Sequence, residues 1–432
     1  MKTLFKNADV LLRKDNNYDV LEGAFVGING DTIDYIGTQL PTEKYDIEKD
    51  MNGKLLMPGL YNNHTHSAMT LLRGIGSDLP LNEWLFDTIF PIEDKLDNHK
   101  VGVGCELAML EMLAGGTVSF TDMYFFLDDQ FEKIIKSGIK ANICRPVQCF
   151  DPTETPENSF RIKESLDYFN KYNNTADGRM LVDFSIHAEY TVTENIAKYY
   201  IEKCNEHNGN MHIHVSETKK EHLECIERHG VTPTQWLYKL GAFESSLNMA
   251  HCVAIDEKDM EIIRTHNATV SHNPTSNMKL GSGFAKVPQM LEAGINVTLG
   301  TDGTASNNNL NMFEEMHMAS VIHKGFNQDA GIVKTDEIIK MATLNGAKSQ
   351  RRENCGEIKV GCKADIIAIN LDKPHLIPAL DKKALIVYSA QDSDVCMTMV
   401  DGKILYENGE YMTLDKERIY YDVNKAVSEL YR

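Results

Sequence analysis

The sequence of 432 residues predicts an α/β protein, a (β/α)8 TIM barrel joined to a small β-sandwich domain, on three observations. Short β-branched runs alternate with longer helical patterns through the middle of the chain, as in a parallel sheet. Polar residues recur at the C-terminal ends of these runs, where the active sites of barrels lie. Strand-rich segments occupy both ends of the chain and have no helical partners of this kind.

The strand-rich segments come first and last in the sequence. Residues 24–37 alternate around Asn29-Gly30-Asp31, which is a hairpin signal. A matching pattern covers residues 361–370 and 396–411, with its own turn at Asp401-Gly402. We expect these segments to meet in one small β domain.

This arrangement predicts the domain boundaries. The small β-sandwich would contain residues 1–56 and 352–415, and the barrel, residues 57–351, would be inserted between them. Residues 416–432 would form a C-terminal helical tail.

The barrel strands are expected in eight short runs, a number that fits a (β/α)8 barrel of this length. They are residues 55–64, 116–123, 140–147, 181–188, 211–217, 247–253, 268–274 and 296–303. A doubly wound sheet is the alternative, but no G-x-G-x-x-G follows the first run. Polar residues end many of the runs, which favours the barrel: His64 and His66, Asp122, Arg145, His187, His214 and Glu217, His251, His272 and Asp302.

Composition excludes several classes of function. Lys and Arg total 44 against 63 Asp and Glu, a formal net charge of −19, so a nucleic acid polymer is an improbable partner. No run approaches the about 18 apolar residues of a membrane span, and the charges in the first residues predict no signal peptide. The nine scattered cysteines suit free thiols, and we expect a cytoplasmic protein. A single nucleoside stays possible as a ligand, and so does a homo-oligomer.

A metal site is predicted from four of the strand-end residues. His64 and His66 are two residues apart on a strand and therefore share a face. His214 and Asp302 complete a set of three imidazoles and one carboxylate, which suits one Zn²⁺, with Fe²⁺ or Mn²⁺ as alternatives. His212 shares the face of His214, so one of the two could instead fill the barrel interior, and Asp302 could be only a turn residue. No lysine ends the fourth run, which favours one ion over a bridged pair.

Proton transfer needs further groups. A water on such an ion becomes a hydroxide nucleophile near neutral pH. Glu217, three residues past His214, is the candidate acid/base, because burial in a dry pocket would raise its pKa. It could instead be a solvated residue of the first helical turn. His251 is the candidate hydrogen-bond partner of the hydroxide, and a buried core histidine is the alternative.

Five segments together resemble the amidohydrolase superfamily and, within it, the 5'-methylthioadenosine/S-adenosylhomocysteine deaminases. They are "PGLYNNHTHSAMTLLRGIGSDLPLNEWL", "HIHVSETKKE", "AHCV", "SHNPTSNMKLGSG" and "LGTDGTASNNNLNMFEEM". The resemblance covers nearly the whole chain. The metal motifs are shared by many amidohydrolases, whereas "TLLRG…LPLNEWL" and "SHNPTSNMKL…GTDGTASNNN" are more typical of adenosine-type and related aromatic-ring deaminases.

The resemblance implies catalytic roles. His64, His66, His214 and Asp302 would bind the metal. Glu217 would protonate ring N1 while hydroxide attacks C6. Asp302 would pass the proton of the water to the departing ammonia, and His251 would hold the hydroxide.

It also implies the substrate contacts. Glu83 would accept hydrogen bonds from the ribose hydroxyls, and His187 would contact the purine. Arg145 and Arg161 would lie near the 5' substituent and pair with the carboxylate of S-adenosylhomocysteine, although Arg161 could be a solvated helix-start residue. Glu189 stands where the family usually has proline. It could repel that carboxylate from above the site or point to solvent.

These inferences lead to metal-dependent hydrolytic deamination of an adenosine-type nucleoside. The substrate would be 5'-methylthioadenosine, S-adenosylhomocysteine, adenosine or 5'-deoxyadenosine, and the products the inosine analogue and ammonia. One alternative is another aminohydrolase or chlorohydrolase of the same superfamily, acting on guanine, cytosine or a triazine. The other is a catalytically inactive scaffold, against which the complete ligand set argues.

Overall fold

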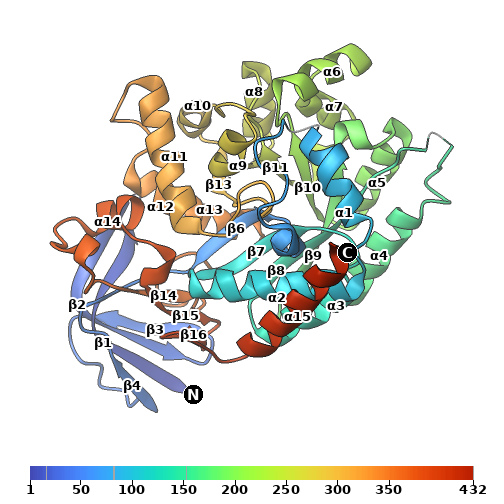
Figure 1. The fold of residues 1–432 in the computed structure, drawn as a ribbon. Coiled ribbons are helices and arrows are strands. Elements are labelled where there is room, and N and C mark those ends of the chain that lie inside the picture. The colour runs from blue at the N-terminus through green and yellow to red at the C-terminus, as the bar shows by residue number, and fades with distance from the viewer. Residues whose placement is uncertain (16, 81–82, 152, 432) are drawn as a thin grey trace.

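A computed structural model describes residues 1–15, 17–80, 83–151 and 153–431, and it confirms a barrel with a separate sheet built from the terminal segments (Figure 1). The barrel sheet has eight strands that pair in chain order, all in parallel. They are β6 (Leu60–Thr65), β7 (Thr117–Met123), β8 (Lys140–Val147), β9 (Met180–Ala188), β10 (Asn210–Val215), β11 (Ser246–His251), β12 (Thr269–His272) and β13 (Asn296–Leu299). Just past β13, the backbone N–H of Asp302 donates to the carbonyl of His64 (2.9 Å), so the last strand lies beside the first.

Helices cover the outside of this sheet, which is why strands such as β6, β7 and β8 are buried at every residue. The covering helices are α2 (Asn98–Ala114), α3 (Asp128–Ser137), α4 (Phe160–Tyr172), α5 (Glu194–Glu206), α6 (Lys219–His229), α7 (Pro233–Lys239), α8 (Glu257–Thr265), α9 (Pro274–Lys279), α10 (Val287–Glu292), α11 (Met312–Asn327), α12 (Thr335–Ala342) and α13 (Leu344–Ser349). The described residues contain no helix with the length and apolar character needed to cross a membrane.

The first expected barrel run is divided between the two sheets. Its first part is β5 (Lys54–Pro58), which pairs with the terminal strand β14 (Ile366–Asn370), and its second part is β6. The division falls at Gly59, where a Cβ would lie 2.2 Å from Cγ1 of Val118. Both parts of the run are buried, so its residue pattern does not mark the division in the sequence.

The terminal segments form a separate hydrogen-bonded sheet of nine strands. Besides β5 and β14, its strands are β1 (Lys2–Lys14), β2 (Asn17–Asn29), β3 (Thr32–Gly37), β4 (Ile47–Asp50), β15 (Val395–Val400), β16 (Lys403–Glu407) and β17 (Glu410–Tyr411). The N–H of Ile33 donates to the carbonyl of Cys362 (2.9 Å), which joins the N-terminal hairpin to the segment before β14. Figure 1 shows these blue and red strands side by side, and they enclose a core of their own.

The remaining segments connect or cover these two parts. They include the 3-10 helix η1 (Ser67–Leu72), the π-helix η2 (Glu83–Ile89), and the helices α1 (Phe90–Glu93), α14 (Lys382–Tyr388) and α15 (Lys416–Leu430). The last helix lies against α2, where Arg418 pairs with Glu106 (2.6 Å). The short 3-10 turns are η3 (Glu189–Thr191), η4 (Ala242–Glu244), η5 (Pro374–Leu376) and η6 (Asp392–Asp394).

Candidate active site

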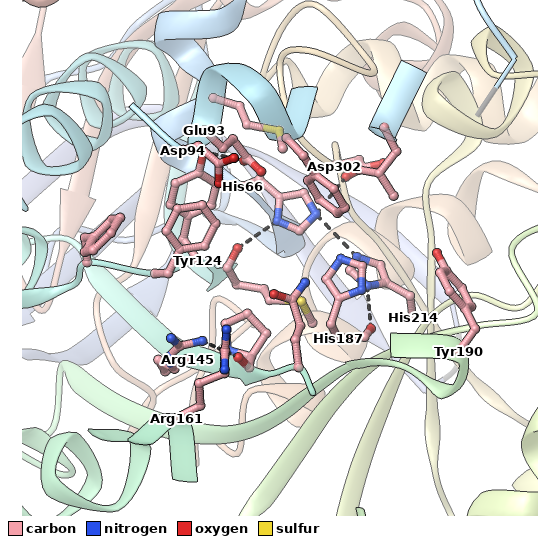
Figure 2. Close-up of a pocket in the computed structure, with 18 of the residues that line it drawn as sticks. His66, Glu93, Asp94, Tyr124, Arg145, Arg161, His187, Tyr190, His214 and Asp302 are labelled. Atoms are coloured by element: carbon pink, nitrogen blue, oxygen red, sulfur yellow. Dashed lines mark hydrogen bonds and ion pairs between the residues drawn. The ribbon is translucent and has the colours of Figure 1, made fainter. Parts of the chain in front are cut away.

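A cavity of about 500 Å³ opens at the C-terminal ends of the barrel strands (Figure 2). Seven strands each contribute a lining residue at or just past their end: His66, Met123, Arg145, His187, His214, His251 and Asp302. The structure therefore brings most of the predicted site residues to one place, although they lie far apart in the sequence.

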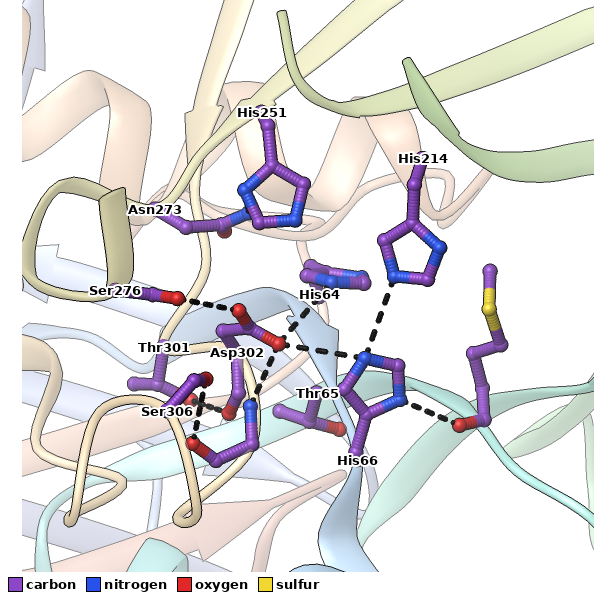
Figure 3. Close-up of polar contacts among 12 residues, drawn as sticks. His64, Thr65, His66, His214, His251, Asn273, Ser276, Thr301, Asp302 and Ser306 are labelled. Atoms are coloured by element: carbon purple, nitrogen blue, oxygen red, sulfur yellow. Dashed lines mark hydrogen bonds and ion pairs between the residues drawn. The ribbon is translucent and has the colours of Figure 1, made fainter. Parts of the chain in front are cut away.

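Three of these side chains, His66, His214 and Asp302, converge with His64 (Figure 3). Oδ1 of Asp302 lies 3.4 Å from Nε2 of His64 and 3.3 Å from Nε2 of His66. Nε2 of His214 lies 3.3 Å from Nε2 of His66. Two overlapping sets of ligand atoms lie within 4.8 Å of one another, His64 with His66 and His214, and His64 with His251 and Asp302, and such nitrogen-rich sets suit a divalent ion of the zinc type.

Hydrogen bonds decide which ring nitrogen faces that point. Nδ1 of His66 lies 2.7 Å from the carbonyl of Met123, and Nδ1 of His214 lies 2.6 Å from the carbonyl of His187. A carbonyl only accepts, so each Nδ1 must donate, and each Nε2 keeps its lone pair toward the centre. These two histidines are therefore prepared as ligands.

His64 contacts another histidine. Its Nδ1 lies 2.7 Å from Nε2 of His212, whose Nδ1 in turn contacts the side-chain amide of Asn248 (2.8 Å). Nε2 of His64 is buried without a hydrogen-bond partner among the described residues. Burial lowers the pKa of His64 to about 4, so the ring is neutral at pH 7 and able to bind a metal. Of the two histidines on β10, His214 thus faces the centre, whereas His212 lies in the barrel interior.

Asp302 owes its position to an uncommon backbone conformation. Its φ is 62°, in the left-handed region, and its N–H bonds to the carbonyl of His64. Ser276 Oγ donates to Oδ2 (2.6 Å), which leaves Oδ1 toward the histidines. His251 also has a positive φ (71°), and such conformations are common at active sites.

Glu217 lies beside the centre and is only 8% exposed, so it is not a solvated residue of α6. Oε2 of Glu217 lies 3.9 Å from Nε2 of His251. Burial raises the pKa of Glu217, although the nearby His251 opposes this rise. The carboxylate of Glu221 accepts the N–H of Glu217 (2.7 Å), and Thr218 caps α6, so the turn after β10 is rigidly held.

His187, Arg145 and Arg161 line the cavity farther from the centre. Nδ1 of His187 is buried without a partner among the described residues, and burial lowers the pKa of this ring to about 3. Nε of Arg145 lies 2.6 Å from Oε2 of Glu164. Arg161 is half-buried, and Nη1 lies 3.6 Å from Oε2 of Glu154, so it is not a freely solvated helix-start residue.

The structure does not bring Glu83 into the cavity. Leu81 and Asn82 of the "LNEWL" motif lie outside the described residues, and Glu83 is exposed at the start of η2, while Trp84 and Leu85 line the cavity. The physical reason is the direction of the helix, which turns Trp84 and Leu85 inward and leaves Glu83 outside.

A different carboxyl lies in the cavity wall. Glu93 is 5% exposed and accepts a hydrogen bond from Oη of Tyr124 (2.6 Å). Burial raises the pKa of Glu93 to about 7. The sequence does not single out this residue, because "PIED" has no spacing that distinguishes a cavity residue from an ordinary helical one.

Glu189 neither covers the cavity nor points to solvent. Its buried carboxylate accepts from Nε and Nη2 of Arg228 (3.1 and 2.5 Å) and lies 2.8 Å from Nε2 of His229. The residue therefore ties the loop after β9 to the end of α6, and the next residue, Tyr190, lines the cavity.

Comparison with known proteins confirms the resemblance. A model of the Amidohydrolase family matches residues 55–405. A 5-methylthioadenosine/S-adenosylhomocysteine deaminase from Acetivibrio thermocellus is 44% identical over 437 residues, with 100% of both chains covered. A 5'-deoxyadenosine deaminase from Methanosarcina mazei is 40% identical over 99% of this chain and 98% of its own. The structure of an adenosine deaminase from Xanthomonas campestris with bound zinc has a TM-score of 0.93 at 28% identity, covering 99% of this chain and 98% of its own.

Proposed function

Because the chain belongs to the amidohydrolase family, we propose that it hydrolytically deaminates an adenosine-type nucleoside to the inosine analogue and ammonia. The substrates we consider are 5'-methylthioadenosine, S-adenosylhomocysteine, 5'-deoxyadenosine and adenosine, in accord with the names of the full-length relatives. The observation that carries the proposal is the convergence of three imidazoles and a carboxylate beside the buried Glu217.

The metal ligands in this proposal are His64, His66, His214 and Asp302. Zn²⁺ fits the nitrogen-rich set best, with Fe²⁺ or Mn²⁺ as alternatives. An ion held there lowers the pKa of a water and so supplies the nucleophile.

The residues around it move the protons. Glu217, whose pKa is raised by burial, donates a proton to ring N1 and makes C6 electrophilic. The water oxygen bonds to C6. Asp302 takes one proton of the water and delivers it to the amino nitrogen, the C6–N bond breaks, and ammonia leaves. The second water proton returns to Glu217, and N1 keeps its hydrogen.

His251 holds the attacking water in this scheme. Its Nδ1 lies 2.8 Å from Oδ1 of Asn277 and 3.3 Å from Nδ2 of Asn273, so two amides hold the ring and leave its Nε2 for the water.

The nucleoside is oriented by residues on the cavity wall. His187 offers its unpaired ring nitrogen to the purine, and Arg145 and Arg161 lie at the 5' end. We assign the binding of the ribose hydroxyls to Glu93, because it is buried in the cavity wall. Variants of Glu93 and Glu83 test this assignment against the role predicted for Glu83.

The test measures ammonia release and the change from adenine-type to hypoxanthine-type absorbance with each of the four nucleosides. The proposal expects both signals in the metal-replete protein and neither after metal removal by a chelator. A guanine, cytosine and triazine panel serves as the comparison. Turnover of one of these without turnover of any adenosine analogue would replace the proposed function, and no turnover at all would favour an inactive scaffold.

A further inference from the structure

Opposite charges lie side by side at the far end of the cavity. Figure 2 shows Arg145 and Arg161 across the cavity from Asp302. Glu164, which also lines the cavity, lies 2.6 Å from Nε of Arg145 through its Oε2. Arg161 and Glu164 are three residues apart on α4 and therefore share one face of the helix. This end of the cavity presents cations and an anion together.

Both arginines already have carboxylate partners, so binding a ligand that carries only a negative charge costs free energy. Arg145 already has Glu164 as its partner, and Arg161 has Glu154 at 3.6 Å. The side chains of Arg145 and Glu164 are only 9% and 18% exposed, so water screens their charges weakly. A ligand with a carboxylate alone would add a negative charge beside Glu164. A ligand with both charges would place each of them next to its opposite.

We propose that Glu164 binds the ammonium group of an α-amino acid carried on the 5' end of the nucleoside, while the two arginines bind its carboxylate. Oε2 of Glu164 bonds to Arg145, and Oε1 makes no hydrogen bond within the described residues, so it is available to accept from the ammonium. Glu164 is then a specificity-determining residue that favours zwitterionic over purely anionic 5' substituents. This inference rests on the proposed deaminase function.

The experiment compares kcat/KM for four thioethers of adenosine. They are S-adenosylhomocysteine, its analogue without the ammonium (5'-S-(3-carboxypropyl)-5'-thioadenosine), its analogue without the carboxylate (5'-S-(3-aminopropyl)-5'-thioadenosine), and 5'-methylthioadenosine as the uncharged reference. We expect S-adenosylhomocysteine to exceed the carboxypropyl analogue by about 10-fold or more, the usual size of a charge-assisted hydrogen bond. In Glu164→Gln this ratio should fall to near 1.

The variant separates binding from positioning. A glutamine at this position keeps an oxygen that can accept from Nε of Arg145, and it loses only the charge. If Glu164→Gln lowers kcat/KM equally for S-adenosylhomocysteine and the carboxypropyl analogue, Glu164 only positions Arg145. That result would overturn the inference. Asp167→Asn removes an exposed charge one turn further along α4 and is the matched control. If Asp167→Asn lowers the ratio as much as Glu164→Gln does, a long-range charge effect explains the preference, and a contact with Glu164 does not.

The assignment of Glu164 and the deaminase function can be disproved separately. Turnover of 5'-methylthioadenosine with a parent ratio near 1 overturns the assignment of Glu164 alone. No ammonia from any of the four thioethers, or from adenosine, overturns the deaminase function and this inference with it.

Discussion

The site histidines receive their roles from single hydrogen bonds. His66 and His214 donate to backbone carbonyls of neighbouring strands, and His64 contacts His212. The bonds of His66 and His214 leave Nε2 of each ring with a lone pair for a metal. At the scale of one residue, the chemistry thus depends on neighbours that are distant in the chain, as His212 is from His64.

Glu217 is the residue whose loss should be most damaging. Glu217→Gln removes the proton donor but keeps the shape, so kcat should fall by about 10²- to 10⁴-fold with the metal content unchanged. Steady-state kinetics and metal analysis on the same preparation measure both. Glu227→Gln, on the exposed side of α6, is the matched control and should keep its activity. A variant of Glu217 with nearly normal kcat would remove this residue from the mechanism.

The two candidate ribose carboxylates can be compared directly. Glu93→Gln should lower kcat/KM for adenosine-type ribonucleosides by about 10-fold or more, because Glu93 lies in the cavity wall. Glu83→Gln should have little effect, because Glu83 is exposed. The same measurement with a 2',3'-dideoxynucleoside should show almost no loss in either variant. A larger loss of kcat/KM in Glu83→Gln than in Glu93→Gln would instead support Glu83 as the residue that binds the ribose hydroxyls.

At the scale of an element, β10 carries two histidines with different tasks. Its alternation places His212 and His214 on one face, and only the distance from the end of the strand separates their roles. His214 reaches the cavity, and His212 lies one step deeper against His64 and Asn248. The sequence favours His214, because it lies nearer the end of the strand, and the structure adds the contact of His212 with His64.

The role of His212 predicts a change in metal affinity. His212→Leu removes the partner of His64 Nδ1 and should weaken metal binding by about 10- to 100-fold, as for other groups that orient metal ligands. Competition with a chelator measures this without reference to activity. His212→Gln retains a side-chain amide that can hydrogen-bond Nδ1 of His64 and should recover part of the affinity. Equal affinities of the parent and the leucine variant would show that His64 needs no such support.

At the scale of the whole molecule, burying carboxyl groups makes stability depend on pH. Burial raises the pKa values of Glu221 and Glu315 to about 8, so both hold a proton in the folded state that they lose near 4.5 when unfolded. Their contribution to stability is complete below 4.5 and is lost as the pH rises through 8. Buried histidines such as His64 and His323, with pKa values lowered to about 4, act in the opposite direction, but only below about 6.5.

The free energy of unfolding attributable to these two glutamates should therefore fall between pH 6.5 and 8. Glu315→Gln should make this fall shallower, by at most about 1.4 kcal/mol per pH unit, because one proton fewer is taken up on folding. Urea denaturation of parent and variant at both pH values, at the same metal concentration, measures the difference. Identical slopes would mean that Glu315 is ionised in the folded protein at neutral pH.

The order of the barrel strands and the residues at their ends follow from the amino-acid sequence alone. Parallel strands are short, apolar and separated by helices, and this pattern is local, so a single chain reveals it. Because all barrel strands point the same way, their C-terminal ends must meet. That rule is enough to group His64, His66, His214, Glu217 and Asp302 from their places in the sequence.

Which polar residues outside the strands face the cavity depends on the tertiary structure. Loops and short helices have no fixed period relative to the barrel axis, so the inward turn of Glu93, the exposure of Glu83 and the pairing of Glu189 with Arg228 are not encoded in local spacing. The role of Glu164 is likewise not encoded locally, because it depends on Arg145, which lies on another element. Long-range contacts, not residue type, determine the direction of such side chains, and they exist only in the folded chain.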